Sequence, residues 1–233
     1  MLIIPRISRP RTAEELPAAL EKAGVAWTPI AQAPWANGYP YQPKAEVRVA
    51  HSGDALLVHF RVDEETVRAI ADNNGNVWED SCCEVFIRPT SSLDYYNIEC
   101  NAAAHMLIGH QHITPVTKRE SVRAEGDKPE ASKRESVRAE ASVLATVQRW
   151  SSLGSELFEA KATEGPWELA LIIPASALWC DQVTDLSGLK TKMNFYKCGD
   201  GLPRPHFLSW APLTHPTPKF HLPQQFGDVE FEG

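Results

Sequence analysis

The chain has 233 residues, of which 43% are apolar and 23% charged, and a net charge of −7 at neutral pH. This length and composition predict a globular protein that buries a substantial core as one domain over residues 1–233. The acidic balance argues against nucleic acid as a partner, because polyanions are bound by basic patches that displace counterions. No stretch approaches the roughly 18 apolar residues of a membrane span, so no membrane partner is expected.

The chain shows neither a targeting signal nor a zinc-knuckle pattern. The apolar start over residues 1–5 is too short for a signal peptide, which predicts a cytoplasmic location as written and a secreted or periplasmic one if a leader precedes it. An odd number of cysteines without CxxC spacing argues against a disulfide framework. Reduced, buried thiols are expected at Cys82, Cys83, Cys100, Cys180 and Cys198.

The first third of the chain predicts one helix and then short strands. A capping-box pattern starts a helix at Thr12 that ends near Gly24. Two apolar runs, 45–50 and 55–62, flank the turn-like residues 52–54. They predict a β-hairpin.

An oxygen-rich loop follows a short helix predicted over residues 65–71. Asp72, Asn74 and Asn76 have the alternate spacing of a calcium-binding EF-hand loop. Glycine falls one position early, however, and Cys83 holds the place of the closing glutamate. A calcium site and an ordinary Asn-Gly turn both stay open as interpretations.

Residues 77–89 combine an aromatic ring, acidic side chains and a strand. Over 83–87 apolar residues alternate with Glu84 and Arg88, which predicts a β-strand with those two side chains on one face. Trp78 precedes this strand. An indole beside carboxylate and guanidinium groups suits a sugar ring, whose C–H face stacks on aromatics and whose hydroxyls need polar partners. A core tryptophan beside a half-solvated strand is the alternative.

A second polar strand face is predicted over residues 97–101, where Glu99 and Asn101 lie on the same side. If this strand pairs with the preceding one, Glu99 and Asn101 form a continuous surface with Glu84 and Arg88. Charge pairing across a solvated sheet explains the pattern equally well.

Two further candidate ligand sets lie downstream. His110 and His112 share a predicted strand face near His105, a spacing compatible with metal binding, although exposed histidines on an edge strand explain it too. A haem site is the other alternative and needs a histidine beside Met106 or Met193.

The middle of the chain contains one internal repeat, the octapeptide KRESVRAE at 118–125 and again at 133–140. Two copies are too few for a solenoid. The charged composition predicts a solvated insertion over about 116–147, mobile or partly helical, that lies away from the sheet core and adds little stability.

The remaining chain is rich in short strands, including 168–173 and 194–198, with a short helix over 175–179. Together with 18 prolines, this pattern predicts an all-β fold. We expect a two-sheet antiparallel β-sandwich of the immunoglobulin-like or jelly-roll type with short peripheral helices.

Several segments together resemble the family 9 carbohydrate-binding modules and their single-domain relatives over about residues 27–231. The resemblance is carried by segments 77–80, 84–87, 167–174, 194–196, 209–210 and 226–227. It implies a β-sandwich without catalytic activity, in a family tied to polysaccharide utilisation. It also implies that two aromatic rings clamp a terminal sugar, that a glutamate, an arginine and amides bind its hydroxyls, and that calcium supports the loops.

Trp78 and Glu84 match the first clamp tryptophan and the glutamate of that family. Where a second clamp ring is expected, over residues 215–221, the chain offers Phe220 or a histidine, and Arg88 is the arginine suggested by strand alternation. The sequence therefore predicts non-catalytic binding of a mono- or oligosaccharide or a polysaccharide end by six residues: Trp78, Glu84, Arg88, Glu99, Asn101 and Phe220.

Two alternatives come from other functional classes. Glu84 and Glu99 could serve as the paired carboxylates of a glycoside hydrolase, although no nucleophile elbow, zinc-protease motif or phosphate loop accompanies them. A structural or protein-interaction sandwich that has lost sugar binding is the other. The sequence leaves the sugar and the oligomeric state open.

Overall fold

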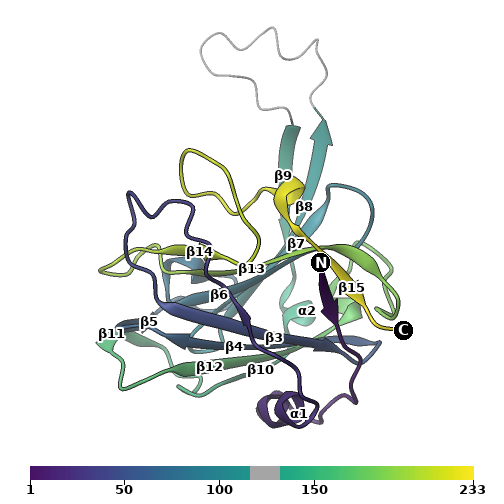
Figure 1. The fold of residues 1–233 in the computed structure, drawn as a ribbon, viewed down its shortest axis with the longest axis horizontal. Coiled ribbons are helices and arrows are strands. Elements are labelled where there is room, and N and C mark those ends of the chain that lie inside the picture. The colour runs from purple at the N-terminus through teal and green to yellow at the C-terminus, as the bar shows by residue number, and fades with distance from the viewer. Residues whose placement is uncertain (116–131) are drawn as a thin grey trace, which may run out of the picture.

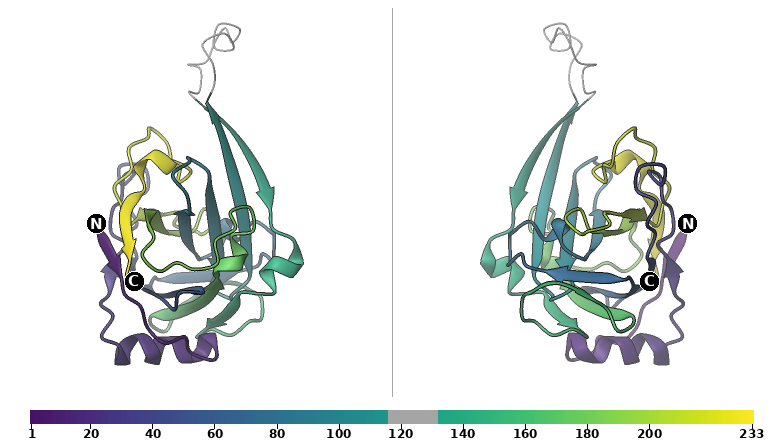
Figure 2. Two further views of the ribbon diagram at one scale, coloured as in Figure 1. Left: turned by 90° about the vertical axis from the view of Figure 1, so that its right-hand side faces the viewer. Right: turned by 90° about the vertical axis from the view of Figure 1, so that its left-hand side faces the viewer.

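Two β-sheets packed face to face form the body of the molecule (Figure 1, Figure 2). The structure is a computed structural model that describes residues 1–115 and 132–233. Within these residues no helix combines the length and the apolar character needed to cross a membrane.

The larger sheet has eight strands. In spatial order they are β1 (Leu2–Ile4), β15 (Gly227–Phe231), β13 (Lys190–Cys198), β6 (Cys82–Arg88), β7 (Tyr95–Asn101), β8 (Met106–Pro115) and β9 (Ser132–Arg138), with β14 (Phe207–Ser209) also paired to β13. Every pair is antiparallel except β1 with β15, which is parallel.

The smaller sheet has five antiparallel strands, in the order β10 (Gln148–Ser151), β12 (Trp167–Pro174), β4 (Ala55–Asp63), β3 (Lys44–His51) and β2 (Thr28–Pro29). Helix α1 (Leu16–Lys22) covers its outer face, where Leu16 and Leu20 pack against Leu57 and Ile172 (Figure 2). Beside the sheets lie a two-stranded sheet of β5 (Thr66–Ala69) and β11 (Phe158–Ala162), helix α2 (Ala141–Leu144), and the 3₁₀ turns η1 (Ala13–Glu15), η2 (Val77–Glu79), η3 (Ala175–Ala177) and η4 (Pro223–Gln225).

The core lies between the two sheets and follows the period-two alternation of the strands. Cys83, Val85 and Ile87 of β6 are buried in the same cluster as Val58 and Phe60 of β4. The alternate residues of β6 point to the outer face of the larger sheet. The outward-facing side chains of β6 are therefore available to line a ligand site.

Most predicted elements are confirmed. The helix from Thr12 exists as η1 followed by α1, the hairpin is β3 and β4, and the four strands predicted at 83–87, 97–101, 168–173 and 194–198 lie within β6, β7, β12 and β13. The fold class is confirmed as an all-β sandwich. The parallel pair and the small third sheet were not predicted, and Cys180, expected to be buried, is exposed.

The helix predicted over residues 65–71 is wrong. Thr66–Ala69 is strand β5 and pairs with β11. The β-branched Thr66 and Val67 favour a strand, and Arg68 extends its guanidinium to Asp80 Oδ1 at 2.9 Å.

The prediction that the whole repeat lies away from the sheet core is also wrong. Residues 132–138 form β9, which pairs with β8 over seven residue pairs. The alternating charges of the second copy are strand periodicity, with Arg134, Ser136 and Arg138 on one face. The first copy, at 118–125, lies outside the described residues.

A charged network is enclosed within the sandwich. Lys197 Nζ lies 3.0 Å from Glu64 Oε2 and 2.8 Å from His206 Nε2, and the Trp167 indole N–H donates to Glu64 Oε1 at 2.8 Å. All four side chains are buried. Burial and the neighbouring ammonium of Lys197 lower the pKa of His206 to about 2, so this imidazole is neutral.

Candidate functional site

A cavity of about 610 Å³ opens on the outer face of the larger sheet. Its floor consists of side chains that alternate with the core residues of the same strands. The floor residues are Glu84, Phe86, Asn97, Glu99, Leu107, Gly109, Gln111 and Ser136, and the surrounding residues include Tyr39, Trp78, Arg134, Arg138, Cys198, Asp200, Phe207, Phe220 and His221.

Strand register brings the floor residues together. Glu84 on β6 is paired directly with Glu99 on β7. In the next row Asn97 is paired with Gly109, which is itself paired with Arg138 on β9. Four consecutive strands therefore contribute neighbouring side chains to one surface.

A chain of hydrogen bonds fixes the polar side chains of the floor. The Gln111 amide donates to Ser136 Oγ at 2.8 Å and to Asn97 Oδ1 at 2.7 Å. The Asn97 amide donates in turn to Glu99 Oε1 at 2.8 Å. These side chains are consequently held in place before any ligand arrives.

Three acceptor oxygens on this floor have no donor among the residues that the structure describes. They are Glu84 Oε2, Glu99 Oε2 and Gln111 Oε1, and all three are buried. An unsatisfied buried polar atom costs about 1–3 kcal/mol, and more if it is charged. The floor is therefore complementary to a ligand that donates several hydrogen bonds.

Gly109 makes room for this arrangement. A Cβ atom at this position would lie 2.5 Å from Asn97 Oδ1 and 2.9 Å from Gln111 Nε2. Any larger residue would push both amides out of their present positions. Glycine is thus required here because there is no room for a side chain. The backbone conformation at this position does not itself require glycine.

The acidic side chains of the cavity hold protons more tightly than usual. Burial raises the pKa of Glu99 to about 7, and burial together with the nearby charge of Glu79 raises that of Asp200 to about 6. Burial and then the charge of Glu99 raise the pKa of Glu84 well above its ordinary value.

The raised pKa of Glu99 predicts a pH-dependent stability. The folded state binds the proton more tightly than the unfolded state, so the stabilisation is complete below pH 4.5 and is lost as pH rises to about 7. Between these pH values ionisation of Glu99 should lower the free energy of unfolding by on the order of 3 kcal/mol, and Glu99→Gln should remove that contribution. Urea titrations at several pH values across this range measure the free energy of unfolding. Exposed Glu159→Gln is the control, and parallel curves for wild type and Glu99→Gln would contradict the prediction.

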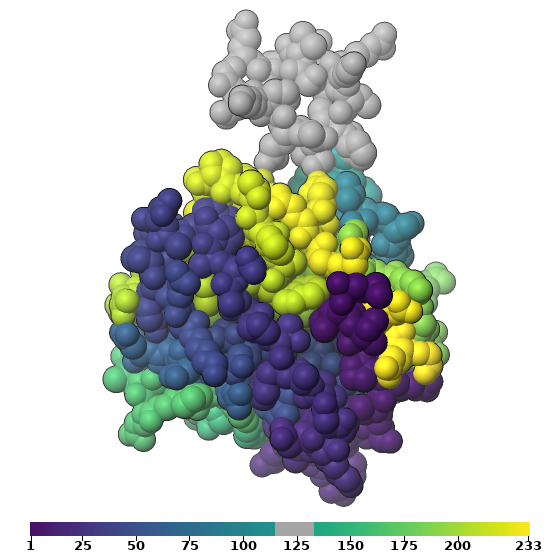
Figure 3. All heavy atoms as spheres, viewed as in Figure 1, coloured from purple at the N-terminus to yellow at the C-terminus, as the bar shows by residue number. Residues whose placement is uncertain are grey.

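Aromatic rings border the cavity. Trp78, carried by η2, is only partly buried, and Arg138 Cζ lies 5.8 Å from its ring centre. Phe220 stacks on Tyr196 with centroids 4.1 Å apart and an interplanar angle of 13°. The loops that carry Tyr39 and Phe220 lie side by side on the surface (Figure 3), joined through Phe207.

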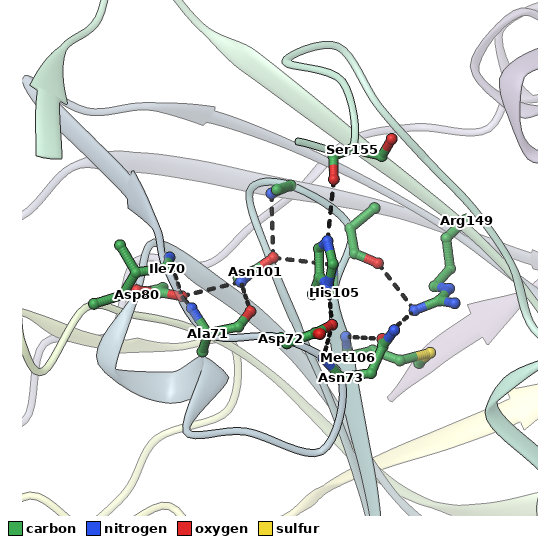
Figure 4. Close-up of polar contacts among 12 residues, drawn as sticks. Ile70, Ala71, Asp72, Asn73, Asp80, Asn101, His105, Met106, Arg149 and Ser155 are labelled. Atoms are coloured by element: carbon green, nitrogen blue, oxygen red, sulfur yellow. Dashed lines mark hydrogen bonds and ion pairs between the residues drawn. The ribbon is translucent and has the colours of Figure 1, made fainter. Parts of the chain in front are cut away.

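Asn101 and Asp80, which contact each other in Figure 4, support the segment that carries Trp78. The Asn101 amide donates to Asp80 Oδ2 and to the Ala71 carbonyl, both at 3.0 Å. Asp80 Oδ2 also accepts the backbone N–H groups of Ile70 and Ala71. This buried network fixes η2 against the end of β7.

The sequence-family model for carbohydrate-binding family 9 matches residues 14–231. The chain belongs to this family. No match is found among curated protein sequences.

Solved structures agree with the family assignment. A candidate carbohydrate-binding protein from Bacteroides uniformis ATCC 8492 is 39% identical, with a TM-score of 0.85 over 99% of this chain and 98% of that one. Family 9 modules from Caldicellulosiruptor kristjanssonii, solved with glucose and with cellotriose, have TM-scores of 0.57 and 0.56. They share 11% and 10% identity, over all of this chain and 95% and 93% of theirs, and so support the fold alone.

Four of the six residues predicted from the sequence line the cavity: Trp78, Glu84, Glu99 and Phe220. Arg88 does not, because its guanidinium donates to the carbonyls of Ser91, Ser92 and Pro223. Asn101 also lies outside the lining and supports η2 instead.

Sequence reasoning missed several lining residues. Asn97 had a detectable signal, since it shares the strand face of Glu99. Gln111 and Ser136 had none, because their place depends on the pairing of β8 with β9. The other missed polar residues are Arg134, Arg138 and Asp200, whereas His221 belongs to the segment expected to supply the second clamp ring.

The three calcium candidates have separate partners. Asp72 Oδ1 lies 2.7 Å from His105 Nδ1 (Figure 4), the Asn74 amide donates to the Ala139 carbonyl, and the Asn76 amide donates to Glu79. Asn74 also has a positive φ of 60°. Calcium binding at this loop stays a prediction.

The downstream histidines lie apart in separate ion pairs, and the methionines lie in the core. His105, His110 and His112 are paired with three different acidic residues, Asp72, Asp181 and Asp94. Met106 and Met193 are both fully buried in the core between the sheets.

Proposed function

We propose that the cavity binds a mono- or oligosaccharide, including the end of a polysaccharide, without transforming it. The observation that carries the proposal is the set of three buried acceptor oxygens without donors on the cavity floor. Membership of carbohydrate-binding family 9 supports it and favours a role in polysaccharide utilisation.

The chemistry of the cavity suits a sugar. Hydroxyl groups both donate and accept hydrogen bonds, so they match the free oxygens of Glu84, Glu99 and Gln111 whether a carboxyl group is ionised or holds its proton. Trp78 offers an indole face to the C–H groups of the ring. Related modules from C. kristjanssonii have been solved with glucose and cellotriose, which are therefore the first ligands to test.

The position of the two glutamates favours binding over hydrolysis. Glu84 and Glu99 are direct partners on neighbouring strands and belong to the same floor. A glycoside hydrolase places its two carboxyl groups on either side of the scissile bond. A sugar lying on this floor would have both carboxyl groups on one side.

Gly109→Ala tests the proposal with little change in chemistry. The added methyl group should displace the amides of Asn97 and Gln111 and weaken sugar affinity roughly tenfold, which corresponds to about 1.4 kcal/mol. Calorimetry with glucose, cellotriose and sugars found on a glycan array measures it. Gly165→Ala is the control, since a Cβ there meets nothing within 4 Å.

Two results would contradict the proposal. One is the absence of binding to any glycan by folded wild-type protein. The other is release of cleaved product on long incubation with the bound oligosaccharide, which would favour an enzyme. Unchanged affinity in a folded Gly109→Ala variant would show that the floor amides do not position the ligand.

A further inference from the structure

Two cysteines and a glutamate meet at one place in the larger sheet. Cys82 on β6 and Cys198 on β13 are direct strand partners, and Glu84 lies two residues further along the same face of β6. One ligand atom from each of the three lies within 4.8 Å of the other two. Among the residues that the structure describes, this is the one group of at least three metal-ligating side chains so close together.

The group is enclosed by protein but has access to the cavity. Cys82 is fully buried, and Cys198 and Glu84 are at most 2% exposed. The Cys198 thiol donates to Glu84 Oε1 at 3.1 Å, whereas Glu84 Oε2 has no hydrogen-bond partner in the described part of the chain. Cys198 and Glu84 also line the cavity. A buried acceptor therefore remains available beside two thiols.

We propose that Cys82, Cys198 and Glu84 bind a thiophilic divalent metal ion, Zn²⁺, with a fourth coordination position open to the cavity. Two thiolates and one carboxylate suit zinc, whereas calcium and magnesium prefer oxygen ligands alone. In a tetrahedral site with Zn–S bonds of about 2.3 Å the two sulfur atoms would lie about 3.8 Å apart. The present spacing needs only small side-chain movements to reach this.

Metal binding replaces protons that burial now retains. Burial raises the pKa of the Cys82 thiol to about 12 and that of Cys198 well above its ordinary value. Each thiol loses one proton as its sulfur bonds to the metal, and the Glu84 carboxyl loses the proton that burial retains there, so the dipositive ion replaces three protons and leaves one net negative charge at the site. The ammonium of Lys197, whose Nζ donates to the Cys198 carbonyl at 2.7 Å, adds positive charge nearby.

The wild-type protein provides the first test. The metal-free full chain, reduced with a phosphine, is titrated with Co²⁺ as a spectroscopic probe and then with Zn²⁺. We expect one ion per chain, visible bands of tetrahedral Co²⁺, thiolate-to-cobalt charge transfer, and two sulfur ligands in X-ray absorption spectra of the zinc form. A cobalt spectrum without charge transfer, or a zinc shell with fewer than two sulfurs, would overturn the proposal.

Cysteine variants then identify which sulfur atoms bind the metal. Cys82→Ser and Cys198→Ser should each weaken Zn²⁺ binding at least tenfold. Cys83→Ala, whose side chain faces the core, and exposed Cys180→Ala should bind as wild type does. Loss of the signal in Cys180→Ala, or its survival in the Cys82→Ser and Cys198→Ser double variant, would refute the site. The spectra of the wild-type protein decide the matter if a variant fails to fold, and none of these tests depends on carbohydrate binding.

Discussion

Lys197→Met is expected to lower the free energy of unfolding by about 3–5 kcal/mol. The substitution keeps the volume of the side chain but leaves Glu64 charged and buried without its cation. Removing one partner of a buried ion pair is costly because the other charge cannot reach water. Guanidinium titrations of both proteins measure the difference.

A double-mutant cycle shows whether the loss comes from the stranded carboxylate. Glu64→Gln combined with Lys197→Met should recover a large part of the stability, because no uncompensated charge remains. Lys192→Met is the control on the same strand, since its ion pair with Asp228 is at the surface and worth at most about 1 kcal/mol. A loss below about 1 kcal/mol in Lys197→Met, or no recovery in the double variant, would contradict this account.

Trp78→Ala should reduce sugar affinity by about 1–3 kcal/mol, or roughly 5-fold to 150-fold, while the protein stays folded. The ring borders the cavity and is only partly buried, so its removal takes away ligand contact more than core packing. Calorimetry beside thermal melting separates the two effects.

Trp27→Ala is a matched control for this substitution. Trp27 is also partly buried and also lies beneath arginines, with Arg48 and Arg61 each 4.2 Å from its ring centre, but it is not part of the cavity lining. Trp27→Ala should therefore leave sugar affinity unchanged. Equal affinity of wild type and folded Trp78→Ala would show that the indole does not contact the sugar.

Strand periodicity was sufficient to predict part of the site. The alternation of β6 and β7 placed Glu84 and Glu99 on one face, and their pairing is confirmed. The same reasoning also selected two residues at the strand ends that do not line the cavity. Arg88 and Asn101 have the correct parity, but each reaches backbone carbonyls of adjoining segments that periodicity cannot describe.

Long-range pairing explains what the sequence could not show. The octapeptide at 133–140 has the composition of a solvated segment, and only its register with β8 makes Ser136 a partner of Gln111. Likewise Tyr39 meets Phe207 across most of the chain, with ring centroids 4.8 Å apart. Contacts of this kind depend on topology, which local propensity does not encode.

The charges of β9 have a further consequence, for self-association. Within the described residues β9 is the last strand of the larger sheet, so one side of its backbone has no strand partner. Such an edge can template the addition of a strand from another molecule. Here Lys133, Arg134 and Glu135 are exposed along it, and charged side chains oppose the docking of a second edge. The strand that brings arginines to the cavity thereby also protects the sheet against growth into aggregates.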